Sequence, residues 1–272
     1  MEEAAPLAAF EAKWTAVHPE MALAQSLVPA PERPARAAFA CIVCELEQAA
    51  FAIRESEPAA IKLQWWAEEL ARMGSGEARH PLSQALQAWS AHTAVAPTAW
   101  YAAVAGAFAQ RDAEPAPDRE AQLAGYERLS SPLAAIESAL FGPFAVDALA
   151  RARAAARALR ETAGLGESLR DGRLPLPLDV LARHRLARGD LARASPARTA
   201  ASREWLAALA GELALAGSQR IGVAGAAIAS ADRWRARRAV RAGEPLAALP
   251  ALFGHLPMRS VFAAWRAARV QA

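Results

Sequence analysis

The chain has 272 residues, which is enough to bury a sizeable core in one large domain or two small ones, and 54% of the residues are hydrophobic. The formal net charge of +3 at pH 7 suits an anionic ligand or an anionic membrane surface, but it is too small to indicate nucleic acid as a partner. Apolar runs stay well short of the roughly 20 residues of a membrane span. The acidic start Met1-Glu2-Glu3 is unlike a signal peptide, so we expect a cytoplasmic protein.

The composition favours an all-α fold. Much of the hydrophobic content is alanine, the strongest helix former, and no stretch shows the period-two alternation of strands. Prolines break the segment 19–34 and disturb one helix at Ser131-Pro132, and residues 164–177 have little helical character. Helices are expected over residues 5–18, 35–56, 58–73, 81–93, 97–111, 118–141, 144–163, 196–217, 219–242 and 257–270. No linker is long enough to separate domains. The sequence therefore predicts a single domain over residues 1–272.

The helix expected over residues 58–73 carries a tandem tryptophan pair. Its apolar side chains cover more than one face, so we expect it to be buried, with Trp65 and Leu70 between helices. The next helix follows His80-Pro81, and this His is more easily read as a helix cap than as a ligand or base. Cys41 and Cys44 have no further ligands of suitable spacing nearby and are expected to be packed thiols.

This stretch resembles the squalene/phytoene synthase family, whose members typically carry a basic residue, Leu, a Trp pair, a later Leu and then His-Pro. Here the matching residues are Lys62-Leu63-Gln64-Trp65-Trp66, Leu70 and His80-Pro81. The resemblance implies an isoprenoid-synthase-type helical bundle with a central cavity. It also implies the head-to-head condensation of two isoprenoid diphosphates, with Mg²⁺ held by two aspartate-rich motifs that face each other across the cavity.

Both metal motifs that the resemblance implies are degraded. The stretch 40–49 contains no aspartate, and Glu45 and Glu47 are two residues apart, so a helix turns them about 200° away from each other. In the stretch 164–179 the Arg170-Asp171 pair matches the second motif, but the segment that would supply the remaining carboxylates is missing. Glu45, Glu47 and Asp171 are therefore the candidate catalytic remnants, and we expect no metal cofactor.

The leading interpretation is a diverged, catalytically impaired family member that acts as an isoprenoid- or lipid-binding protein or as an assembly factor. Glu45-Leu46 resembles the branch of the family linked to assembly of respiratory complex I, which implies a location peripheral to the inner membrane or a protein partner. The alternative is an active Mg²⁺-dependent head-to-head prenyl-diphosphate transferase with atypical metal ligands. The alternative requires that Glu45 or Glu47 lies with Asp171 at one cavity, whereas the leading interpretation does not.

Two groups of arginines are candidates for binding an anion. Arg170 and Arg173 can hold a phosphate without metal, or pair with Asp171 or Asp179. We expect a reduced apolar cavity between the segments 35–56, 59–73 and 144–169, with Arg170 and Arg173 at its mouth and with Phe51 and Ile53 able to plug it. The second group lies on one face of a predicted helix and consists of Arg233, Arg237 and Arg241. These arginines could bind an anionic ligand or an anionic membrane surface, or they could simply face solvent.

Overall fold

The protein is mainly helical over residues 4–271, the part that the computed structural model describes. This part contains fourteen α-helices and no β-strand, which confirms the all-α prediction. The helices are α1 (Ala4–Val17), α2 (Glu20–Ala24), α3 (Arg33–Glu47), α4 (Ser56–Gly74), α5 (Pro81–Gln87), α6 (Pro97–Ala109), α7 (Arg119–Phe141), α8 (Val146–Ala163), α9 (Leu165–Arg170), α10 (Leu178–Arg183), α11 (Pro196–Ala216), α12 (Gly222–Val240), α13 (Pro245–Leu252) and α14 (Met258–Gln271). No helix among them is both long enough and apolar enough to cross a membrane.

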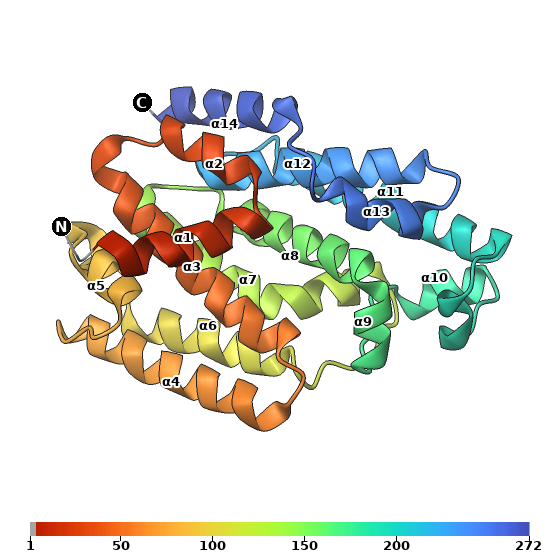
Figure 1. Cartoon of the computed structure of the whole chain (residues 1–272), viewed down its shortest axis with the longest axis horizontal. Coiled ribbons are helices and arrows are strands. Elements are labelled where there is room, and N and C mark those ends of the chain that lie inside the picture. Colours follow the sequence, from red (N-terminus) through yellow and green to blue (C-terminus); the bar gives the residue numbers. More distant parts are fainter. Residues whose placement is uncertain (1–3, 272) are drawn as a thin grey trace.

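Helix α8 runs through the middle of the bundle (Figure 1). It packs against α7 and also against α11 and α12. Helix α6 packs on α7, α4 on α6, and α14 on α12, so α4 and α14 lie at opposite edges of the view in Figure 1. Alanine makes this close arrangement feasible, because Ala154, Ala155 and Ala158 of α8 are fully buried and bring the backbones of neighbouring helices together.

The hydrophobic core has two clusters that share partners. One cluster is built mainly from α1 to α7 and the other from α7 to α13, and Tyr126, Phe141 and Ile228 pack against both. Gly106 marks a close helix crossing, because a Cβ atom there would lie 2.2 Å from the carbonyl oxygen of Arg128 on α7. The single domain over residues 1–272 stays a prediction.

Several helix boundaries differ from those expected. The segments 19–34 and 164–177, predicted to be irregular, contain the short helices α2 and α9, and α13 was not anticipated. Helix α7 continues through Pro132 without a break. An internal proline costs about 3 kcal/mol or more in a helix, but buried Leu129 and Leu133 on either side of it hold α7 in the core.

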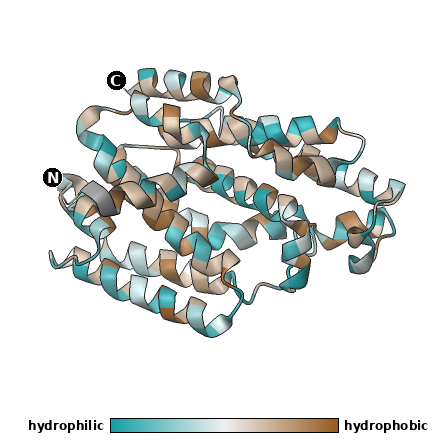
Figure 2. Cartoon of the chain, in the orientation of Figure 1, coloured by the Kyte–Doolittle hydropathy of each residue, from teal (hydrophilic) through white to brown (hydrophobic). Residues whose placement is uncertain are grey.

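The burial predicted for α4 is only half correct. Leu70 and Trp66 are buried, whereas Trp65 is 40% exposed and Ile61 is more exposed still. Hydrophilic and hydrophobic residues alternate along α4 (Figure 2), which makes it an amphipathic surface helix. The prediction that Trp65 lies between helices is therefore wrong. Its ring instead packs edge-on against Trp66 and His80, with centroid distances of 5.1 and 5.5 Å.

His80 caps α5, as the sequence predicts. Its Nδ1 accepts a hydrogen bond of 3.2 Å from the backbone N–H of Leu82. The turn before it is fixed by Glu69, whose buried carboxylate accepts bonds from the backbone N–H groups of Arg79 and His80 and from the hydroxyl of Ser83. Burial opposes the charge on Glu69, but these donors hold its pKa below the usual value. The Trp-Trp and His-Pro motifs thus form one structural unit that joins α4 to α5.

Candidate functional site

The centre of the bundle contains a small cavity. Its volume is about 80 Å³, and it lies between the first two helices, α3, α7, α8 and α12. Apolar side chains such as Phe39, Val43 and Ile228 form part of its wall. The charged side chains of the wall are Arg36, Glu47, Glu137, Arg153, Arg157 and Arg160, and Gln25 and His18 also line it.

Three of the arginines come from α8. Arg153, Arg157 and Arg160 are spaced i, i+4 and i+7, which places them on one face of the helix, and that face points into the cavity. Arg153 pairs with Glu137 of α7, and Arg157 pairs with Glu161 one turn further along α8. The Nε atoms of Arg153 and Arg157 have no hydrogen-bond partner among the described residues. The cavity is therefore lined by guanidinium groups that are only partly satisfied.

Two of the cavity arginines pack over phenylalanine rings. Arg157 lies 4.0 Å above the centre of the Phe51 ring, and Arg36 lies 4.5 Å above that of Phe141. Phe51 is in a π-helical turn, Gln48–Ala52, that ends α3. Arg111 closes this turn by donating to the carbonyl groups of Ala49 and Ile53, both at 2.8 Å.

The two glutamates at the end of α3 face different surroundings. Glu47 lines the cavity, whereas Glu45 accepts hydrogen bonds from Lys13 at 2.7 Å and Lys62 at 2.6 Å. Burial opposes the charge on Glu45, but the two ammonium groups hold its pKa below the usual value. The two-residue spacing thus separates the carboxylates as the sequence predicts.

Asp171 and Arg173 belong to a chain of ion pairs that leads away from the cavity. Arg173 bonds Glu161 at 3.0 Å and Asp171 at 3.4 Å, and Asp171 also meets Arg54 at 2.9 Å. Since Glu161 holds Arg157 as well, the chain links the cavity wall to the surface. Despite burial, the guanidinium groups of Arg157 and Arg173 keep the pKa of Glu161 below its usual value.

The expected position of the cavity was wrong in two respects. Helix α4, expected to form a wall, contributes no lining residue, and neither Arg170 nor Arg173 lines the cavity. The side chain of Arg170 is largely exposed and lies 4.0 Å from Glu167. The short alanine side chains of α8 explain why the cavity lies elsewhere than expected. They bring α7 and α12 close to α8, so the remaining space lies beside the longer arginine side chains of α8.

The residues present do not suit a magnesium cluster. Glu45 and Asp171 each bond cationic side chains instead of converging on the cavity. Within residues 4–271 no three His, Cys, Asp or Glu side chains are grouped so that they could hold a metal ion. Four arginines and two glutamates line the cavity wall, and the nearby acids Glu161 and Asp232 already pair with Arg157 and Arg160 and are not free to bind a divalent cation.

A buried charge network closes one end of the cavity. Arg235 of α12 bonds Glu20 of α2 at 2.9 Å and Asp232 at 2.6 Å, and Arg160 reaches Asp232 at 3.4 Å. Burial disfavours the charge on Glu20, but His18 and Arg235 hold its pKa at about 2. Burial, together with Arg160, lowers the pKa of His18. This network fixes α2 over the cavity.

The cysteines take no part in charge chemistry at neutral pH. Cys41 is buried, and Cys44 lines the cavity. Burial raises the pKa of the Cys41 thiol to about 12 and also raises that of Cys44. Both are packed thiols in the structure, as the sequence predicts.

The comparisons agree with the fold. The squalene/phytoene synthase family profile matches residues 15–266. A dehydrosqualene synthase in complex with ligand superposes with a TM-score of 0.71 at 13% identity, covering 93% of this chain and 97% of that one. The squalene synthase HpnC from Alicyclobacillus acidocaldarius gives 0.62 at 16% identity, with 96% of each chain covered.

At these identities the two structures establish the fold alone, and they confirm the isoprenoid-synthase-type bundle. No curated protein matches the chain. The family profile covers nearly the whole chain, including the Trp-Trp and His-Pro unit and the α8 arginines. The protein therefore belongs to the squalene/phytoene synthase family.

Proposed function

We propose that this protein is a diverged family member that has lost synthase activity and binds a phosphate-bearing isoprenoid or similar lipid-like ligand without metal, in an assembly-type role. The observation that carries the proposal is the row of arginines on α8 inside the central cavity. Guanidinium groups bind phosphate oxygens directly, in planar pairs of hydrogen bonds. They would therefore take over the charge neutralisation that Mg²⁺ supplies in a metal-dependent site.

The size of the cavity supports a non-catalytic role. Pockets that enclose a whole small-molecule ligand usually measure about 300–1,000 Å³, whereas this cavity measures about 80 Å³. It accommodates a phosphate head group more easily than two prenyl chains. In keeping with the resemblance at Glu45-Leu46, the proposal includes a cytoplasmic location peripheral to the inner membrane.

The first test is for turnover. Purified protein with farnesyl or geranylgeranyl diphosphate and Mg²⁺ is expected to release no diphosphate above the background of a heat-denatured sample. Removing an electrostatic stabiliser from an active site typically lowers the rate by about 10²–10³-fold, and this chain lacks several carboxylates. Release of diphosphate that disappears in Asp171→Ala would contradict the proposal and favour the Mg²⁺-dependent transferase.

The second test is for binding. Calorimetry with inorganic diphosphate and with geranyl phosphate should show binding that EDTA leaves unchanged and salt weakens. Arg157→Gln should lower the affinity about tenfold or more, because a hydrogen bond to a charged group contributes about 1.5–3 kcal/mol. Arg170→Gln is the matched control, since this arginine is exposed and lies outside the cavity.

The sequence-based candidate gives a third arm. If Arg173→Ala weakens binding while Arg157→Gln does not, the phosphate site lies in the 164–177 segment and the cavity is not the site. If neither ligand binds at all, ligand binding is excluded and only the assembly role of the proposal is left. Metal-dependent binding would again favour the transferase.

A further inference from the structure

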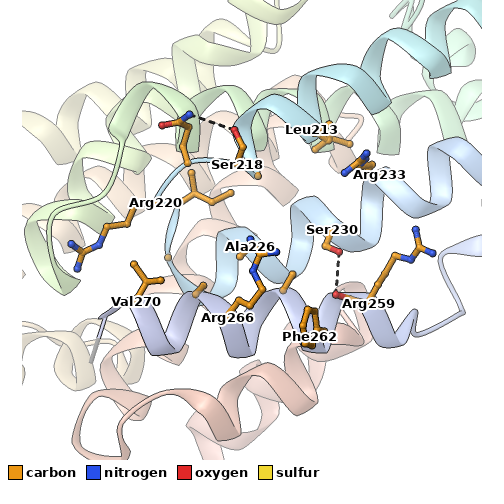
Figure 3. Close-up of a pocket in the computed structure, with 17 residues that line it drawn as sticks. Leu213, Ser218, Arg220, Ala226, Ser230, Arg233, Arg259, Phe262, Arg266 and Val270 are labelled. Carbon is orange, nitrogen blue, oxygen red and sulfur yellow. Dashed lines mark hydrogen bonds between the residues drawn. The ribbon is translucent and has the colours of Figure 1, made fainter.

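A second, larger hollow also borders α12, where Ala226 and Ser230 line it, whereas Ala224 and Ile228 line the central cavity. This hollow measures about 600 Å³ and lies between α14, the C-terminal end of α11 and the N-terminal half of α12 (Figure 3). The side chains of Arg220, Arg233, Arg259 and Arg266 line it, and no Asp or Glu does. Phe262 and Val270 of α14 stand beside these arginines in Figure 3.

Helix α14 is amphipathic, and its outer face is apolar. Ser260 and Ala264 are buried on the side that packs on α12 and α2. The opposite side presents Met258, Phe262 and Trp265, spaced i, i+4 and i+7, of which Met258 is 71% and Phe262 58% exposed. Exposed apolar side chains in such a row mark an interaction surface more often than scattered single ones do.

An aromatic pair on this face packs against an arginine side chain. Phe262 stacks on Trp265 with a centroid distance of 5.4 Å, and the guanidinium of Arg269 lies 5.0 Å from the centre of the Trp265 ring. Tryptophan rings and arginines placed in this way are typical of proteins at the boundary between lipid head groups and acyl chains.

The arginines around α14 lack carboxylate partners within the described part of the chain. Elsewhere arginines pair with acids, as Arg151 does with three glutamates. Residues 245–272 contain no Asp or Glu, so α14 has no internal counter-charge. The exposed arginines of this face line the hollow, line an adjoining one that shares Arg259, or pack on Trp265; they are Arg220, Arg233, Arg237, Arg238, Arg241, Arg259, Arg266 and Arg269.

We propose that α14 and these arginines form a docking face for an anionic lipid bilayer. Met258, Phe262 and Trp265 would enter the interface while the arginines pair with lipid phosphates. Each cationic side chain near an anionic surface strengthens binding by about fivefold, and buried apolar area adds to this. This docking proposal rests on the peripheral location proposed above, but it does not require that the central cavity binds a ligand.

A bilayer matches this face better than other occupants do. Nucleic acid would use the arginines and the aromatic stack, but it gains little from exposed Met258 and Val270. A second copy of the chain would set the same arginines against each other across a two-fold axis. A bilayer of anionic lipid satisfies both the charge and the apolar row.

The test is co-flotation with vesicles of phosphatidylcholine, with and without phosphatidylglycerol. We expect binding to the anionic vesicles, weakened by salt, and little binding to phosphatidylcholine alone. The triple variant Arg259→Gln, Arg266→Gln, Arg269→Gln should bind on the order of 100-fold less. Its control carries the same charge change at exposed arginines on other elements, Arg79→Gln, Arg128→Gln and Arg193→Gln, and should change binding by about threefold or less.

A second arm tests the apolar row. Met258→Ser with Phe262→Ser should weaken binding about tenfold or more, because two apolar side chains no longer leave water. The control is Ile61→Ser with Tyr101→Ser, which are also exposed but lie on α4 and α6 at the other edge of the molecule (Figure 1). Circular dichroism melting curves check that each variant is folded, and the two arms change different residues.

Several outcomes would overturn the proposal. These are no binding to anionic vesicles, equal binding to both vesicle types, an equal loss in the control triple variant, or retention of RNA without binding to vesicles. Because the assay uses no isoprenoid ligand, its failure is distinct from failure of the cavity proposal.

Discussion

Arg235→Met removes the cation that bridges Glu20 and Asp232 at the buried end of the central cavity. All three side chains are fully buried, and the bonds from Arg235 measure 2.9 and 2.6 Å. Breaking a buried ion pair from one side leaves the opposite charge without compensation and typically costs about 3–5 kcal/mol. A domain has only about 5–15 kcal/mol of stability, so the variant should lose a large part of it.

The same contacts also lower the pKa of Glu20, which gives a second magnitude and a pH signature. Its fall from 4.5 to about 2 corresponds to about 3 kcal/mol of stabilisation. Because the pKa is lower in the folded protein, this stabilisation is complete above about pH 4.5 and is lost as the pH falls towards 2. In Arg235→Met part of this pH dependence should disappear, because one of the two groups that favour the charged form of Glu20 is gone while His18 remains.

The assay is urea unfolding followed by far-ultraviolet circular dichroism, repeated between about pH 2.5 and 7. Arg238→Met is the matched control: it is the same change on the same helix, at an exposed arginine, and should alter stability by about 0.5 kcal/mol or less. A loss of less than about 1 kcal/mol in Arg235→Met, or an unchanged acid limb of the pH profile, would refute the reasoning about this network.

Two further predictions concern packing in the scaffold. Trp66→Ala should lower the free energy of unfolding by about 3–5 kcal/mol, while Trp65→Ala, at a half-exposed ring, should cost clearly less; equal losses in urea unfolding would contradict the positions of the two rings. Gly106→Ala should destabilise strongly, because its Cβ would meet the Arg128 carbonyl oxygen at 2.2 Å, whereas Gly211→Ala, with open space around it in α11, should stabilise by up to about 1 kcal/mol. A melting temperature unchanged in Gly106→Ala would show that α6 and α7 are not in contact there.

The fold could be predicted because its signals are local. The alanine-rich helices and their proline starts follow from the backbone preferences of single residues, and the His80 cap follows from the His-Pro pair. The exposure of Trp65 could not be predicted in this way. Apolar residues on several faces of α4 indicate burial only when neighbouring helices cover all of them, and those neighbours come from distant parts of the chain.

The α8 arginines show the same limit at the site. Their spacing of four and three residues is visible in the sequence, but arginines on one face of an alanine-rich helix usually indicate a solvent-facing surface. Their position inside the bundle depends on Glu137, which belongs to another helix, and on Phe51 in the π-helical turn after α3. Arg170 and Arg173, by contrast, stood out in the sequence only because they lie in the degraded motif.

The proposal of metal-free anion binding assigns a definite role to the charges of the cavity. A carboxylate-lined site repels a diphosphate until Mg²⁺ enters, so it needs the metal for binding as well as for chemistry. Here the carboxylates Glu137 and Glu161 neutralise arginines instead. An arriving phosphate would compete with them for Arg153 and Arg157, which makes binding metal-free, salt-sensitive and moderate in strength. On this proposal the site would hold an anion without supplying a metal ion to a departing diphosphate, so the binding test and the turnover test examine the same hypothesis.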